Sequence, residues 1–109
     1  MVETIHANLA EAKAEDIVVL DLDGKSAIAD HMVIASGRSN RHVGSIADKL
    51  VESLKSEARP LRIEGLAQAD WVLIDAGDVV VHIFRPEVRS FYNLEKLWSS
   101  EAPAERMAV

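Results

Sequence analysis

An apolar run that ends in two aspartates is the feature of this sequence that most suggests chemistry. Val18 to Leu20 lead into Asp21-Leu22-Asp23-Gly24, and haloacid-dehalogenase-type phosphatases hold a nucleophile and an acid/base beside magnesium with such a pair. Here Lys25 stands where those enzymes keep threonine, no later lysine is followed by an acidic pair, and 109 residues are too few for that fold. A strand that ends in an Asp-Gly turn explains the motif more simply.

A second candidate motif is Ser36-Gly37-Arg38-Ser39, ahead of a helical pattern. Backbone N–H groups at such a position can bind an anion, as in the Gly-Ser loop of nucleotidyltransferases. Those enzymes also need a carboxylate pair on a strand that follows the loop. Asp21 and Asp23 precede it, and Asp75 and Asp78 flank a turn instead of alternating along one strand. The motif is therefore better explained as a helix cap.

The remaining nucleophiles and metal ligands do not form a recognisable site. The chain has no cysteine, which excludes disulfides, thiolate metal sites and thiol catalysis. Its four histidines do not show metal-ligand spacing with one another. We therefore predict that the protein is not an enzyme and that it has no catalytic residues, no metal and no cofactor.

The elements that would position any site follow from hydrophobic periodicity. The pattern predicts helices over residues 4–14, capped by Thr4, from Ser39 or Asn40 to about Leu54, and from Pro86 to about Trp98 with a possible break at Asn93. It predicts strands over residues 17–20, 32–35, 61–64, 71–75 and 79–84, with a hairpin turn at 75–78. This order indicates an α/β fold, a mixed sheet of about five strands covered by helices, with residues 1–100 as a single domain and 101–109 as a disordered tail.

Charge favours a protein partner over nucleic acid. The net charge is −6, and residues 63–98 carry six acids against three bases. Phosphate binding needs clustered Lys and Arg, whereas an acidic surface suits a basic protein. We therefore expect little direct nucleic-acid binding. The sequence also shows neither a membrane-length apolar run nor a secretory signal at its first residues, so we expect no membrane association and a cytoplasmic location.

The aromatic residues indicate where a partner would bind. All five lie between residues 71 and 98, and Trp, Tyr and Arg dominate protein interfaces. Phe84 and Phe91 fit a core position best, whereas Trp71 and Tyr92 fit a core and an interface equally well. An exposed aromatic patch could also pair with its own copy, which leaves a homodimer of the free protein open.

Several stretches of the chain, in order, resemble the ribosomal silencing factor (Iojap-like) family. The resemblance is most specific from Asp70 to Trp98 and extends back to about Ile5. It includes Lys13-Ala14-Glu15-Asp16-Ile17-Val18-Val19-Leu20-Asp21, Ala29-Asp30-His31-Met32-Val33-Ile34-Ala35-Ser36-Gly37, Ser39-Asn40-Arg41-His42-Val43, Glu64-Gly65, Asp70 to His82, Pro86-Glu87-Val88-Arg89 and Tyr92 to Trp98.

This resemblance implies a fold related to nucleotidyltransferases without their catalytic carboxylates. It implies that the protein binds ribosomal protein uL14 on the large ribosomal subunit, blocks an intersubunit bridge, prevents joining of the small subunit and represses translation. The positions that match the family's contact residues are Trp71, Pro86, Tyr92, Leu94 and Leu97, with Asp75 and Glu95 as an acidic rim. The rival interpretations are a metal-dependent phosphotransfer enzyme that uses Asp21 and Asp23, and a self-associating structural module.

The incomplete aspartate motif gives a first testable prediction. We expect no turnover of a generic phosphomonoester or of nucleoside triphosphates with magnesium or manganese, because Asp21 and Asp23 lack the partner residues of a phosphotransfer site. Colorimetric phosphate release measures this directly. Turnover by the wild type that disappears in a folded Asp21→Ala variant would show that the protein is an enzyme.

Overall fold

The computed structural model describes residues 2–22, 29–55 and 61–92, and for residues 90–92 it describes the backbone alone. The described elements, in chain order, are α1 (Val2–Glu11), β1 (Glu15–Asp21), β2 (His31–Ser36), α2 (Asn40–Lys55), β3 (Arg62–Glu64), β4 (Trp71–Asp75), β5 (Val79–Phe84) and α3 (Pro86–Tyr92).

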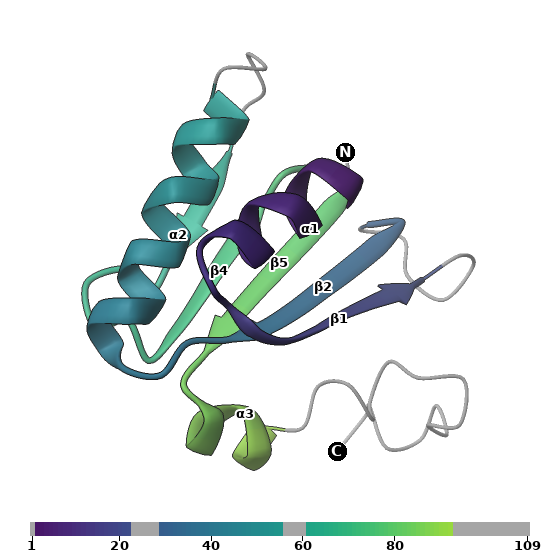
Figure 1. The fold of residues 1–109 in the computed structure, drawn as a ribbon. Coiled ribbons are helices and arrows are strands. Elements are labelled where there is room, and N and C mark those ends of the chain that lie inside the picture. The colour runs from purple at the N-terminus through teal and green to yellow at the C-terminus, as the bar shows by residue number, and fades with distance from the viewer. Residues whose placement is uncertain (1, 23–28, 56–60, 93–109) are drawn as a thin grey trace.

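The described strands form one mixed sheet in the order β1-β2-β5-β4-β3. Among them, β2 and β5 run parallel, whereas β1, β4 and β3 each run antiparallel to their neighbours. Both α1 and α2 lie on the same side of this sheet, and α3 follows the end of β5 (Figure 1). The predicted α/β class, with a mixed five-stranded sheet and helices, is confirmed.

Helix α2 forms because its apolar residues recur at helical spacing and its first turn is capped. Val43, Ile46, Leu50 and Leu54 are buried along one side, as a 3.6-residue period requires. The hydroxyl of Ser39 accepts a hydrogen bond from the backbone N–H of His42 at 3.1 Å, which identifies Ser39 as the cap. None of the described helices has the length and apolar character that a membrane crossing requires.

The sheet is buried differently on its two faces. On the face beneath the helices, Val72 and Ile74 of β4 and Val81 and Ile83 of β5 pack with α2 in one hydrophobic core. On the other face, a smaller core cluster contains Leu22, Ala29, Met32, Ile34 and Phe84, with Leu20, Trp71, Val80 and Val88 packed against it. Because strand residues alternate between faces, β5 contributes to both cores.

Helix α1 differs at both ends from the sequence prediction. It begins at Val2, so Thr4 lies within the first turn and is not the cap; Val2, Ile5 and Leu9 together pack into the core. It ends at Glu11 because Lys13 adopts a φ of 64° and the N–H groups of Lys13 and Ala14 bond to the carbonyls of Ala10 and Leu9. This is a Schellman termination with lysine where glycine is usual.

The predictions for the two hairpin strands and the closing helix fare better. Both β4 and β5 have the predicted bounds, and the turn between them closes with a bond from the N–H of Ala76 to the carbonyl of Val79. Pro86 is the first residue of α3, as predicted. The predicted continuation to Trp98, the break at Asn93 and the tail 101–109 lie outside the described residues.

Two glycines with positive φ allow a test of how tightly the β3–β4 connection is packed. Gly65 has a φ of 84°, and a Cβ on it would fall on the carbonyl oxygen of Trp71, whereas Gly77 has a φ of 89° and open space around it. We expect Gly77→Ala to cost about 1–2 kcal/mol of unfolding free energy, the usual cost of a left-handed L-residue. Gly65→Ala should cost more, because β4 must also move.

Urea unfolding of the two variants measures the difference. Since both share the backbone cost, the excess in Gly65→Ala reports the contact with Trp71. Equal losses of unfolding free energy in the two variants would mean that β3 and β4 can move apart at Gly65 at no measurable energetic cost.

Candidate partner-binding surface

The face of the sheet opposite α1 and α2 carries the candidate site. We call it the aromatic face and define it by Trp71, Leu73 and Asp75 of β4 with His82 and Phe84 of β5. Cross-strand register pairs Trp71 with Phe84 and Leu73 with His82, so these side chains adjoin. The three β4 residues are half-buried, whereas Phe84 is only 1% exposed and His82 only 7%. The accessible part of this face therefore consists of two apolar side chains and one carboxylate, and Phe84 and His82 beneath them belong to the core.

A hydrogen bond and ring stacking hold the aromatic face together. The indole Nε1–H of Trp71 donates to Nδ1 of His82 at 2.9 Å. The indole also stacks on Phe84, with ring centroids 5.0 Å apart and planes 30° apart, and His82 stacks on Phe84 at 5.9 Å and 8°. Such offset stacking of rings is favourable beyond the area it buries. The Trp71 side chain is therefore fixed from two directions.

His82 is neutral in this arrangement. Burial lowers the pKa of His82 from 6.5 to about 4, because removal from water disfavours the charged imidazolium. The Nδ1 atom accepts the bond from Trp71, so in the neutral ring the proton is on Nε2. Protonation at Nδ1 would remove the acceptor that Trp71 uses.

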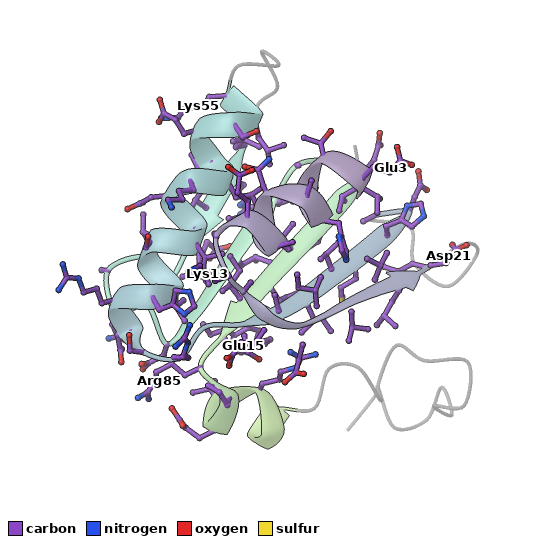
Figure 2. All side chains as sticks on the ribbon, viewed as in Figure 1. Glu3, Lys13, Glu15, Asp21, Lys55 and Arg85 are labelled. Atoms are coloured by element: carbon purple, nitrogen blue, oxygen red, sulfur yellow. The ribbon has the colours of Figure 1, made fainter. Side chains whose placement is uncertain are left out.

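Helix α3 is attached to the end of the sheet by polar contacts. Nη1 of Arg89 donates to the hydroxyl of Ser36, the last residue of β2, at 2.8 Å, and Ser36 is buried. Nε of Arg85 lies 3.3 Å from Oδ1 of Asp70, an ion pair without hydrogen-bond geometry. Arg85 lies where β5 leads into α3 (Figure 2). These contacts fix where α3 leaves the sheet.

The same aspartate also joins the helix layer to this junction. The side-chain amide of Asn40, the first residue of α2, donates to Oδ1 of Asp70 at 2.8 Å and to the carbonyl of Gln68 at 2.8 Å. The carboxylate of Asp70 therefore contacts Asn40 of α2 and Arg85, the residue before α3. Asp70 itself directly precedes Trp71. The position of the aromatic face is in this way coupled to the helices on the other side of the sheet.

The structure brings some of the predicted contact residues together. Trp71 and Asp75 lie on the same face of β4, and Pro86 is exposed at the start of α3. One carboxylate oxygen of Asp75 accepts the N–H of Gly77 at 2.9 Å, so part of this side chain serves the turn. Tyr92 is the last residue of α3, and its side chain is outside the description. Leu94, Glu95 and Leu97 lie outside the described residues.

Sequence reasoning gave no role at this face to Leu73, His82 or Arg89, and it considered Ser36 only as part of a possible anion-binding loop. Leu73 could have been found, because strand alternation places it on the same face as Trp71 and Asp75. The other three act through contacts between residues distant in sequence, which no local pattern signals.

The structure separates the groups that could have formed a catalytic site. Asp21 pairs with His31 at the start of β2, whereas the loop from Gly37 follows the end of β2, roughly 20 Å away at strand spacing. The N–H of Gly37 bonds to the carbonyl of Phe84, and that of Arg38 bonds to Nδ1 of His42, so both donors already have partners. Within residues 2–22, 29–55 and 61–92, no group of three or more acids or histidines could hold a metal ion.

A polar groove lies between α1 and α2, on the side of the sheet away from Trp71. The amide of Asn8 crosses it to the hydroxyl of Ser53 at 3.1 Å. It is lined by Asn8, Glu11, Ala12, Lys49, Glu52 and Ser53. The groove is polar and lacks aromatic side chains among these lining residues, so the aromatic face remains the better candidate for a protein contact.

Solved structures share this fold over nearly the whole chain. A crystal structure of a Chromobacterium violaceum protein matches with a TM-score of 0.87 and 36% identity, covering 94% of this chain and 86% of the other. One from Bacillus halodurans matches with a TM-score of 0.81 and 41% identity, covering 89% and 91%. The chain is therefore of the same class, a single mixed sheet with two helices on one face.

Sequence comparison identifies the family within that class. The family described as "Ribosomal silencing factor during starvation" matches residues 1–108. A ribosomal silencing factor of Zymomonas mobilis is 52% identical over 99 residues, 90% of this chain and 74% of its own length. One from Halalkalibacterium halodurans is 45% identical over 91% of this chain and 86% of its own length. The chain belongs to the ribosomal silencing factor family, as the sequence resemblance predicted, and its relatives support a role in translation regulation at the ribosome.

The buried histidine gives a prediction on pH. The unfolded chain takes up a proton at His82 near pH 6.5 and the folded chain only near pH 4. His82 therefore imposes no penalty above about pH 6.5, and stability is lost as the pH falls from there towards 4. At about pH 4.5 this loss amounts to about 2–3 kcal/mol relative to neutral pH.

The matched control is His82→Asn, which does not titrate and keeps an acceptor near the position of Nδ1. Urea unfolding of both proteins at neutral and mildly acidic pH isolates the contribution of His82, because the acids of the chain are common to both. If the two stability–pH curves were parallel, His82 would titrate normally in the folded protein.

Proposed function

We propose that this protein binds the large ribosomal subunit in the cytoplasm through ribosomal protein uL14, with the aromatic face and α3 as the contact surface. Occupation of that site blocks an intersubunit bridge, prevents the small subunit from joining and so represses translation. This mechanism is steric exclusion of the small subunit by the bound protein and involves no catalysis.

The observation that carries the proposal is the half-buried Trp71 on an apolar sheet face. Interface energy concentrates in a few large, rigid side chains near the centre of a contact, and Trp71 is large, fixed by His82 and Phe84, and still accessible. Leu73 adds accessible apolar surface beside it, and Asp75 supplies a carboxylate on the same face of β4. The exposed Glu64 and Glu87 are each paired with an arginine, Glu64 with Arg62 at 4.0 Å and Glu87 with Arg85 at 3.3 Å.

Charge supports a basic protein as the partner. The net charge of −6 opposes close approach to an RNA backbone and favours approach to a basic ribosomal protein. Names of relatives support the ribosome as the binding partner, since the bacterial ones are ribosomal silencing factors and a mouse relative, 36% identical over 92% of this chain and 46% of its own length, is named for mitochondrial assembly of the ribosomal large subunit. The choice of uL14 as the partner rests on the sequence resemblance to the family.

Truncation on the two faces of the sheet tests the proposal. Trp71→Ala should weaken binding to isolated uL14 by about 30-fold, equivalent to about 2 kcal/mol for an interface anchor, and Leu73→Ala should weaken it less. Val19→Ala is the matched control: it is also a partly exposed strand residue (39%), but its register partner Val33 packs beneath the helices. This variant should bind as the wild type does.

The measurements are calorimetry with uL14, co-sedimentation with purified large subunits and subunit joining by light scattering. Thermal unfolding accompanies them, because Trp71→Ala also loses packing on Phe84 and must be compared well below its melting temperature. Unchanged affinity of folded Trp71→Ala would place the contact elsewhere. Lost binding without recovered joining would exclude occlusion as the mechanism, and tight, salt-sensitive binding to rRNA fragments would identify RNA as the partner.

A further inference from the structure

We propose that His82 is a positioning residue for the partner contact: by accepting the indole N–H of Trp71, it fixes the ring so that the partner meets apolar ring surface alone. The inference rests on the proposed function and adds the chemistry of the contact at Trp71. A partner that fits this surface offers aliphatic or aromatic side chains there and needs no hydrogen-bond acceptor.

The geometry for this role comes from the antiparallel pairing of β4 and β5. Trp71 faces Phe84 and Leu73 faces His82, so His82 lies diagonally from Trp71, within reach of a long ring. The indole rests on Phe84 at 5.0 Å and its N–H is held by His82 at 2.9 Å. Stacking alone would allow the indole to turn within its plane on Phe84, and the hydrogen bond selects one orientation.

The hydrogen bond to His82 also gives the indole N–H of Trp71 an acceptor in the free protein. The N–H is the only polar group of a tryptophan side chain. Were it unpaired, burial beneath a partner would leave a donor without an acceptor, which is costly. With His82 in place, the ring is desolvated without this cost, and it loses little conformational freedom on binding because it is already ordered.

Two substitutions at one position separate the acceptor from the volume. His82→Leu keeps most of the side-chain volume but removes the acceptor, and we expect on the order of tenfold weaker binding to uL14 from loss of the acceptor for the indole N–H. His82→Asn places Oδ1 near the position of Nδ1 and should recover most of that affinity. The indole Nε1–H resonance of Trp71, distinguished from that of Trp98 by Trp98→Phe, should shift in the leucine variant and stay near its wild-type position in the asparagine variant.

A double-mutant cycle with Trp71→Phe tests whether the effect passes through the indole. Phenylalanine has no N–H, so His82→Leu should cost no further affinity in that background, whereas a general structural effect of His82 would persist. Wild-type affinity in His82→Leu, or an equal loss in both backgrounds, overturns the inference while the proposed function stands. No binding of wild-type protein to uL14 overturns the proposed function, and the inference with it.

Discussion

The burial of β5 on both faces is the constraint on which the rest of the structure depends. Val81 and Ile83 face the helices, and His82 and Phe84 face the aromatic side. A strand in that position tolerates a polar group only if it is uncharged and paired. The imidazole of His82 meets both conditions, since burial lowers its pKa and Trp71 supplies the donor. The orientation of the proposed anchor residue is thus a consequence of how the core accommodates a histidine.

The parallel pairing of β2 with β5 determines what happens at the end of the sheet. Because both strands finish at the same edge, Ser36 lies beside Phe84, and the segments that leave the two strands meet there. The Gly37 loop bonds back to Phe84 and Arg89 bonds to Ser36. The backbone N–H groups that would bind phosphate in an enzyme bond here to acceptors of the same chain. The N–H groups of Gly37 and Arg38 are therefore already paired within the protein.

Sequence patterns were sufficient for elements whose stability is local or periodic. The stripe on α2, the hairpin of β4 and β5 and Pro86 at the start of α3 all follow from spacing and residue type, whereas the choice between Ser39 and Asn40 as the cap of α2 needed the structure. The end of helix α1 was misjudged because Lys13 adopts a conformation that favours glycine, so the residue type at that position gave no signal of the termination. The His82–Trp71 and Arg89–Ser36 bonds depend on strand register, so they became visible only in three dimensions. For the aromatic face, the sequence located Trp71 and Asp75 but gave no sign of what orients them.

The alternation along β4 divides its five residues between two roles, packing in the core and exposure on the aromatic face. Val72 and Ile74 pack in the core, whereas Trp71, Leu73 and Asp75 project from the other side of the same strand. In the proposed contact, the part on β4 therefore lies at alternate positions of one short strand, and those three side chains can be exchanged while Val72 and Ile74 keep their places in the core. Strand alternation thus separates the residues of β4 that hold the fold from those available for a partner, so the two sets can change independently.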